Sequence, residues 1–441
     1  MRSVQSILIG IVFMWAAVTH IEAAQAQLPE GPLTLRDCIS IALTYNPSLT
    51  SSRQSVVSAE AGLEQARSGY WPQLSFTWVE GLTGTTSFLS VGGRTVGFAG
   101  TDVREDVDFV FRQSLWQRGR HENVKANKAS LTGASHNYEA AIQSLVEGVA
   151  RDYYGVLAAE SLMEVAQARV KSAKEHLEEV KARVAVGTAA EVEIFPAEDD
   201  LARADLEEID ASSNIRLAFA QLKNTLGLAP DTVLELAESA AVEEPSLPSL
   251  QEAMKSAYTS RPDLISARAS VERSRYSFAS AKIRRGPLVE FFGQYQQGYS
   301  EWRARDPSWQ VLMSLSWPLL DGGATDADET QARAENVRAE ADLQTLVNQV
   351  GLEVESARVE VIRTRQRVAA TAKSVAAAEA RLAAAEGKYR EGMAIFLEVS
   401  DALAALSDAR ASQVNARYDH ELARVRLEKA LGRLTPEGLA E

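Results

Sequence analysis

An internal duplication constrains this chain more than any other feature. Four residues recur with an offset of 215: Leu35, Ala42, Pro47 and Pro72 return as Leu250, Ala257, Pro262 and Pro287. Gly119 then returns as Gly323, and three matches share an offset of 205: Gly187 with Gly392, Glu193 with Glu398, and Leu226-Gly227 with Leu431-Gly432. Ordered matches of this kind indicate one structural unit written twice. We expect a first repeat at 27–235, a linker at 236–248 and a second repeat at 249–441.

The two copies differ in length at one place. The offset falls by about ten between Pro72 and Gly119, which locates an insertion in the glycine- and threonine-rich stretch 81–101 of the first copy. Insertions are tolerated best at exposed loop tips. We therefore expect a loop tip in this stretch.

The first 26 residues have the form of a secretory signal peptide. Arg2 is followed by the apolar run 7–18 and by the small residues of Ala24-Gln25-Ala26, so the mature chain is expected to begin at Gln27. The alternative is an anchor retained in the inner membrane. The run has about a dozen residues, fewer than the ~20 that a membrane-spanning helix needs, and cleavage is therefore favoured.

Composition excludes several classes of function. The net charge of −14 argues against nucleic acid as a partner, since phosphate binding requires basic patches. Cys38 is the only cysteine, so we expect a small buried helix residue, with a reactive thiol as the alternative. The histidines lack metal-ligand spacing, and we find no nucleophile motif or phosphate loop. We expect no catalytic residue, metal or cofactor.

Each copy is expected to open with two short helices. Thr34 is a plausible N-cap for a helix at 35–45, with Asp37 at its third position. Pro47 ends this helix and allows a second one at 48–68. The corresponding helices of the second copy are 250–260 and 262–285.

After these helices the periodicity changes to two, which predicts strands with one apolar face. We expect β-hairpins at about 72–116 and about 287–318, with strands of about ten residues that have aromatic residues near their ends, as in strands that cross lipid. The alternative is a pair of half-buried hairpins on a soluble core. The residues expected to face lipid are Leu74, Phe76, Trp78, Phe109, Phe111, Phe291, Tyr295, Trp309, Val311, Met313, Leu315 and Trp317.

Four strands cannot close a barrel in lipid, where barrels begin at about eight strands and open edges are costly. Subunits must therefore share one barrel. Two copies would give eight strands and an interior filled by side chains. Three copies would give twelve strands and room for a lumen.

The last part of each copy reads as a long helical hairpin, at about 119–227 and about 323–432. The stretch 120–186 lacks proline and reaches roughly 100 Å as a helix. Its apolar residues step by three or four, as in a coiled coil; the residues expected in this contact are Leu162, Ala166, Val170, Ala173, Leu177, Val180 and Val184. Pro196 is expected to interrupt the returning helix of the first copy. The alternative reading is an ordinary cytosolic coiled coil, which would not alternate with such hairpins.

This architecture resembles the TolC family of outer-membrane efflux and export channels. The residues that carry the resemblance are the opening Leu35, Ala42, Asn46-Pro47 and Leu49, then Tyr70-Trp71-Pro72, Val186-Gly187-Thr188, Leu320-Asp321-Gly322-Gly323, and the closing Leu226-Gly227 and Leu431-Gly432. They cover nearly the whole mature chain. The resemblance implies a mainly α duplicated fold with a β-barrel portion: a homotrimer with a twelve-stranded outer-membrane β-barrel and a long periplasmic α-helical barrel.

The resemblance also implies a function. Such a chain would be an exit duct for cargo from an inner-membrane pump, joined through a periplasmic adaptor protein, without catalysis. The helical tips would contact the adaptor, through Val186, Gly187, Thr188, Gly392 and Met393. The alternative is that these residues only cap the helices.

Acidic residues near the tips would form rings at the periplasmic entrance. They are Glu398 and Asp401, with Glu193 as the weaker candidate. The alternative is acids beside a helix N-terminus or plain solvated charges. Well-studied members of the family have a basic residue two positions after the second glycine, where this chain has Ala394. The contact that holds the entrance closed is therefore expected to differ.

The competing function is a secreted periplasmic structural or adaptor protein with coiled coils; a passive porin is a weaker reading.

Overall fold

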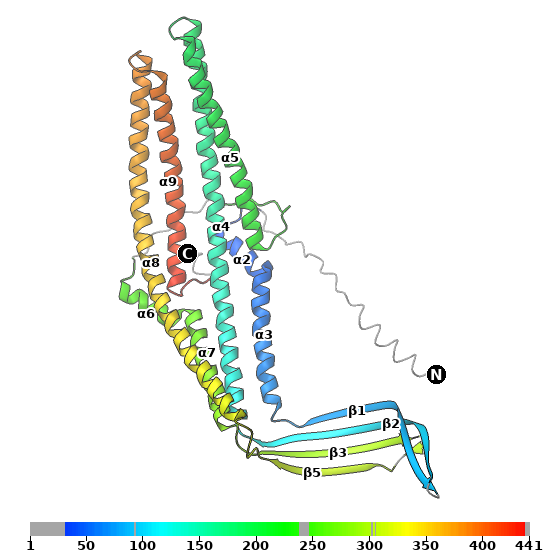
Figure 1. Ribbon diagram of the computed structural model, residues 1–441. Helices are drawn as coiled ribbons and strands as arrows, with labels where there is room; N and C mark the ends of the chain where they lie inside the picture. The colour runs from blue at the N-terminus through cyan, green and yellow to red at the C-terminus, as the bar shows by residue number, and fades with distance from the viewer. Residues whose placement is uncertain (1–30, 92–93, 238–246, 301–302, 305, 437–441) are drawn as a thin grey trace.

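The computed structural model describes residues 31–91, 94–237, 247–300, 303–304 and 306–436. Figure 1 shows an elongated molecule, with long helices running side by side, a sheet at one end and two helical turns at the other. Among the described residues, no helix is both long enough and apolar enough to cross a membrane. The expected signal peptide lies outside the described residues.

Two short helices open each copy, as expected. Helix α2 (Leu35–Tyr45) begins with a capping box, in which Thr34 accepts from the Asp37 amide and the Asp37 carboxylate accepts from the Thr34 amide. Helix α6 (Leu250–Ser260) begins with the same motif. Helices α3 (Pro47–Ser68) and α7 (Pro262–Ile283) each have proline at their first position, where no amide partner is lost.

One antiparallel sheet contains strands from both copies. Its members are β1 (Gln73–Val91), β2 (Arg94–Gln117), β3 (Leu288–Ser300), β4 (Arg303–Ala304) and β5 (Ser308–Ser316), in the order β1-β2-β3-β4 with β5 also on β3. The short β4 and β5 both pair with β3, so they act as one interrupted fourth strand. Pairing of β2 with β3 joins the two hairpins.

The first hairpin reverses within 81–101, where a loop tip was expected, but most of this stretch is strand. Strands β1 and β2 remain paired as far as Val91 opposite Arg94, so the insertion lengthens both strands. The physical reason is that continued pairing satisfies the backbone groups of a threonine-rich segment, which a loop would leave to water. The first hairpin therefore extends well beyond the second.

Four long helices form the rest of the molecule: α4 (Arg120–Ala185), α5 (Ile194–Leu226), α8 (Ala324–Arg390) and α9 (Phe396–Ala430). Of the residues expected in the coiled-coil contact, Ala166, Ala173, Leu177 and Val180 are buried. The expected interruption at Pro196 is wrong, because α5 begins only at Ile194. Proline therefore lies in the first turn, where its missing amide has no helical partner to lose.

The helices lie in a fixed lateral order. In the half nearer the sheet, α3 packs on α4, α4 on α7 and α7 on α8. In the half nearer the tips, α5 packs on α4, α4 on α9 and α9 on α8. Helices α4 and α8 run through both halves (Figure 1). One lateral edge of the molecule is therefore β1, α3 and α5, and the other is β5 and α8.

The largest core lies midway along the molecule, where α2 packs on α4 and α5. The segment after α5 packs beside this core: Leu33 forms a parallel bridge to Leu236, and the Tyr153 hydroxyl donates to the Ala237 carbonyl at 2.6 Å. Cys38 is fully buried there, which confirms the expectation, and burial raises the pKa of its thiol to about 12.

Candidate functional site

A row of aromatic side chains crosses one face of the sheet. The register places Phe76 opposite Phe109, Phe109 opposite Tyr295, and Tyr295 opposite Trp309, so these four residues form one row across the sheet. Strand alternation puts the other expected lipid-facing residues of β1, β2, β3 and β5 on the same face. Trp317 follows the last residue of β5. The sequence-predicted apolar set is therefore brought together on one surface.

This apolar face is uncovered in the single chain. Trp309 is 75% exposed, Met313 74% and Leu74 72%. Phe111 and Phe291 are half-buried because their rings meet edge to face, with centroids 5.7 Å apart. Exposed apolar patches of this extent mark a surface that meets lipid or another protein.

The opposite face of the sheet carries a row of polar side chains, alongside the apolar Phe292 and Leu312. The Gln310 side-chain amide donates to the Gln294 carbonyl oxygen at 2.7 Å, and the Gln294 amide donates to the Asp108 carboxylate at 3.3 Å. These hydrogen bonds run across three strands. The sheet thus separates an apolar surface from a hydrogen-bonding one, which is the arrangement of a barrel wall with a wet interior.

The apolar face has charged residues at the end away from the helices and tryptophan residues at the end near the helices. Glu80 lies opposite Glu105, and Glu105 accepts a hydrogen bond from the Trp78 indole at 2.9 Å. Near the helices, Trp116 and Trp317 are both more than half exposed. At ~3.3 Å per residue, the stretch from Trp309 to Trp317 spans about 26 Å, close to the ~25 Å height of a lipid-facing band.

The two helical turns at the far end are built alike. Gly187 has φ of 74° and Gly392 has φ of 73°, both left-handed. The Thr188 amide donates to the Arg183 carbonyl, and the Met393 amide donates to the Lys388 carbonyl, so each glycine closes its helix. Val186 is 74% exposed and Met393 69%. A side chain at either glycine would meet open space.

The three acidic candidates lie just after these turns. Glu398 and Asp401 are exposed and three residues apart on α9, and their neighbours Val399 and Ala402 are fully buried. Glu193 is half-buried in a short 3-10 helix, Glu191–Glu193. The two α9 carboxylates therefore point away from the core of their own chain.

The sequence did not predict a contact between the two helical hairpins, which Arg183 and Tyr389 form. The Arg183 guanidinium of α4 lies 4.3 Å from the ring centroid of Tyr389 in α8 and donates to its carbonyl at 3.2 Å. Glu179 pairs with the same guanidinium at 3.2 Å. Burial raises the pKa of the Tyr389 hydroxyl. The duplication gave no sign of this contact, because the position of Tyr389 is occupied by Val184 in the first copy.

A buried ion pair was missed as well. The Arg169 guanidinium of α4 donates to the Asp200 carboxylate of α5 at 2.5 Å, with both side chains almost fully buried. At the offset of 205, the second copy has Ser374 and Ala405. The pair therefore belongs to the first helical hairpin and has no equivalent in the second. A charged residue at an otherwise apolar helix position was the signal available in the sequence.

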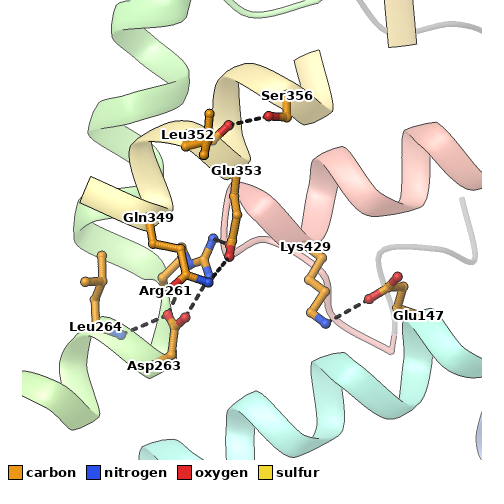
Figure 2. Close-up of polar contacts among 9 residues, drawn as sticks. All are labelled: Glu147, Arg261, Asp263, Leu264, Gln349, Leu352, Glu353, Ser356 and Lys429. Atoms are coloured by element: carbon orange, nitrogen blue, oxygen red, sulfur yellow. Dashed lines mark hydrogen bonds and ion pairs between the residues drawn. The ribbon is translucent and has the colours of Figure 1, made fainter. Parts of the chain in front are cut away.

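A charged groove of about 790 Å³ lies midway along the molecule, lined by residues of α4, α7, α8 and α9. Figure 2 shows Arg261 between Asp263 and Glu353, and Lys429 reaching Glu147. Burial alone would raise the pKa of Asp263, but its hydrogen bonds and the charge of Arg261 hold that pKa below its ordinary value. Opposite charges are thus paired along the groove.

Two relatives illustrate the similarity in sequence. The chain is 25% identical over 253 residues to the outer membrane protein TolC of Vibrio cholerae, which is 56% of this chain and 58% of that protein. It is 26% identical over 334 residues to the protein CyaE of Bordetella pertussis, 74% of this chain and 68% of that one. The chain thus covers somewhat more than half of the length of the Vibrio relative.

Solved structures share the fold over nearly the whole length. The CmeC outer membrane channel of Campylobacter jejuni has a TM-score of 0.78 at 17% identity, covering 92% of this chain and 88% of that one. VceC of Vibrio cholerae has a TM-score of 0.75 at 20% identity, covering 90% and 96%. The fold is therefore the duplicated TolC-like fold.

The family model described as outer membrane efflux protein matches residues 38–228 and 253–433. These two segments correspond to the two copies of the duplication, from α2 to the end of α5 and from α6 to the end of α9. The chain belongs to the outer membrane efflux protein family.

Proposed function

We propose that three copies of this chain form an outer-membrane channel that serves as the exit duct of an efflux or export system. The observation that carries the proposal is the apolar aromatic face of the sheet, exposed on one side and backed by a hydrogen-bonded polar face. In this proposal the twelve residues from Leu74 to Trp317 named above face lipid. The polar face, with Asp108, Gln294 and Gln310, lines the lumen.

The free edges of the molecule support closure into a ring. Among the strands that the structure describes, β1 pairs only with β2 and β5 only with β3, so each leaves an edge that lipid cannot satisfy. The two edges lie on opposite lateral sides, as do α5 and α8. Contacts between unlike edges are head to tail, and they form a ring when the rotation between copies closes. Three chains give the smallest ring with room for a lumen.

The helical tips would face the periplasm. In the proposed arrangement Val186, Gly187, Thr188, Gly392 and Met393 contact a periplasmic adaptor protein, which joins the duct to an inner-membrane pump. Their exposure and the open space around both glycines support this role. The chain is also similar to the outer membrane efflux protein BepC of Brucella suis and to the alkaline protease secretion protein AprF of Pseudomonas aeruginosa, which fits a duct that takes its cargo from the pump.

The acidic residues near the tips would narrow the entrance. Glu398 and Asp401 point away from their own core, so three copies would place six carboxylates around the axis, and Glu193 could add to them. Rings of carboxylates favour cations, and the carboxylates repel one another.

The competing function, a soluble periplasmic coiled-coil protein, requires that the aromatic face of the sheet be covered by protein.

Spin labels distinguish the two functions. Labels at Phe76, Phe109, Phe291 and Val311 should be accessible to oxygen and protected from a water-soluble nickel complex in outer-membrane vesicles. A label at Gln310, on the opposite face, is the matched control and should show the reverse. Recovery of the protein as a soluble periplasmic monomer, or water accessibility at all four apolar sites, would reject the channel.

A further inference from the structure

We infer that the part of the first hairpin beyond the lipid-facing band pairs with the same part of the neighbouring subunits and narrows the outer mouth of the channel. This part, which we call the extension, consists of 82–91 of β1 and 94–103 of β2. The inference rests on the proposed trimeric channel and adds a separate contact between its subunits. The partner is a second copy of this chain.

The extension is a ribbon of two strands. Strand β2 pairs with β3 as far as Arg104 opposite Ser300, and beyond this point it pairs only with β1 among the described strands. Ten consecutive pairs, from Leu82 opposite Val103 to the turn, hold the ribbon together. At ~3.3 Å per residue, the ribbon is about 30 Å long.

Both edges of this ribbon are open in the proposed ring. Strands β4 and β5 together have eleven residues, whereas β1 has nineteen, so β4 and β5 of a neighbouring subunit cannot cover the whole of β1. On the other side, β2 from 94 to 103 lies beyond the end of β3. A two-stranded hairpin is at best marginally stable by itself in water. The extension therefore requires a further strand at its edges.

The sequence of the extension does not protect these edges. Natural proteins protect a free edge with charged residues, proline or bulges. Between 82 and 101, Arg94 is the one charged residue and proline is absent. Strands β1 and β2 also pair here without a bulge. Edges of this composition are prone to pair with other strands.

The extension of a neighbouring subunit supplies the missing strand. Each extension offers one edge of β1 and one edge of β2, and these two strands are antiparallel. The β2 edge of one subunit can therefore pair with the β1 edge of the next in the same antiparallel sense. The proposed ring brings three extensions to one mouth. Together they form a closed ring of six strands without a free edge, which we call the crown.

A six-stranded crown is much narrower than the barrel below it. Barrel diameter grows with the number of strands, and side chains already fill the interior at about eight strands. Figure 1 shows β1 and β2 turning sharply at the end of the sheet away from the helices, beyond the ends of β3 and β5. Glycine within strands is typical of such bends. Four glycines lie in or beside the extension: Gly81, Gly84, Gly97 and Gly100.

The composition of the crown suits a mouth that opens for cargo. The extension is rich in glycine, serine and threonine. Such small residues leave a passage for water and ions inside six strands, but none for a larger molecule. Glycine also weakens strand pairing. Cargo under the drive of the pump would therefore separate the three extensions more easily than the strands of the barrel.

Distances between spin labels test the crown. Ser90→Cys carries the label in the extension, and Glu80→Cys is the matched control at the end of the lipid-facing band. Both positions are exposed and share one face of β1 by strand alternation. Because diameter grows roughly linearly with strand number, the distance between subunits at 90 should be about half of that at 80. Cys38 is fully buried and stays unlabelled.

A shortened hairpin tests the narrow mouth. Replacing 83–102 with Asn-Gly joins Leu82 to Val103 through a two-residue turn of the kind that hairpins favour. A polyethylene glycol that fits a twelve-stranded barrel but not a crown is added on the barrel side of a planar bilayer. It should lower the conductance of the shortened trimer and leave that of the full-length trimer unchanged. The same polymer on the side of the helical tips is the control and should affect both proteins alike.

The outcomes separate the crown from the proposed function. Equal distances at 90 and 80, or entry of the polymer into the full-length trimer from the barrel side, would overturn the crown and leave the channel in place. A full-length protein that is monomeric in detergent would overturn the ring itself. If the shortened chain does not assemble, the label distances in the full-length trimer decide.

Discussion

At the scale of single residues, four glycines that end the long helices have nearly the same backbone but different surroundings. Their φ angles are 74° at Gly187, 73° at Gly392, 76° at Gly227 and 72° at Gly432. A Cβ at Gly227 would lie 2.6 Å from the Tyr45 carbonyl oxygen, whereas the turns at the tips face open space. The duplication thus preserves one conformation for two purposes: close packing in the middle of the molecule and exposed turns at its end.

Alanine at these glycines should separate strain from packing. Gly187→Ala adds only the cost of a left-handed alanine, about 1–2 kcal/mol. Gly227→Ala adds the same strain and a collision with backbone, a further ~1–3 kcal/mol. Thermal unfolding of the two variants in detergent should therefore show the larger loss for Gly227→Ala. Equal losses would mean that the Tyr45 turn moves aside freely.

The acidic candidates allow a second prediction at this scale. If Glu398 and Asp401 surround the entrance, the double change Glu398→Ala and Asp401→Ala should raise single-channel conductance and weaken block by cations in planar bilayers, because six carboxylates are removed. Glu207→Ala, an exposed acid farther along α5, is the control. Unchanged conductance and block in the double variant would leave these residues as solvated charges.

At the scale of elements, ion pairs fix the helices to one another at places where the two copies differ. Glu147 of α4 pairs with Lys429 of α9, and Arg261 connects the start of α7 to Glu353 of α8. Asn46 stands at the position of Arg261 in the first copy and instead caps α3 through the Ser48 amide. The duplicated backbone is thus held by different side chains in each half.

The contact between Glu147 and Lys429 predicts a pH dependence. Burial alone would raise the pKa of Glu147, but Lys429 and Arg151 bring it below its ordinary value of 4.5. A lowered carboxyl pKa stabilises the fold above the unfolded value, and this contribution is lost as the pH falls through the folded pKa. Glu147→Gln should therefore cost roughly 1–3 kcal/mol at neutral pH, and progressively less below 4.5.

Melting curves of the wild type and Glu147→Gln across this pH range measure the difference. Glu64→Gln is the matched control, because the Glu64–Arg67 pair is exposed and contributes little. A difference between wild type and Glu147→Gln that stays constant down to strongly acidic pH would contradict the role of the charge.

At the scale of the whole molecule, its two lateral edges are complementary. The edge formed by β1, α3 and α5 and the edge formed by β5 and α8 each run from the sheet toward the tips. Barrel and helical tube would therefore close through the same rotation between subunits. A chain with such edges covers the exposed apolar residues of α5 and pairs its free strand edges only in an assembly.

Leu206, Ile209 and Leu217 are large apolar residues of α5 that are more than half exposed, and a charge among them should prevent assembly. Leu217→Asp would place three carboxylates in the apolar boundaries of a trimer, where an unpaired charge is costly. We expect loss of the trimer in detergent by light scattering, with helix content by circular dichroism retained. Asn214→Asp, which adds the same charge to an exposed polar position of α5, should leave the trimer intact. A trimer that survives Leu217→Asp would place the boundary elsewhere.

The sequence by itself determined the duplication, the order of helices and strands, and which strand residues share a face. These features depend on local rules: caps at Thr34 and Ser249, prolines at the first turns of α3 and α7, and alternation along β1 and β5. The boundaries of the two repeats, the role of the tips and the acidic ring stay predictions.

The tertiary structure alone decided which distant segments lie together. It paired β2 with β3, continued the first hairpin through the expected loop, and brought Arg183 to Tyr389 and Arg169 to Asp200. Local periodicity specifies the face on which a side chain lies, but not the partner across it. That partner depends on the packing of segments far apart in the chain, where burial and desolvation decide which contacts form.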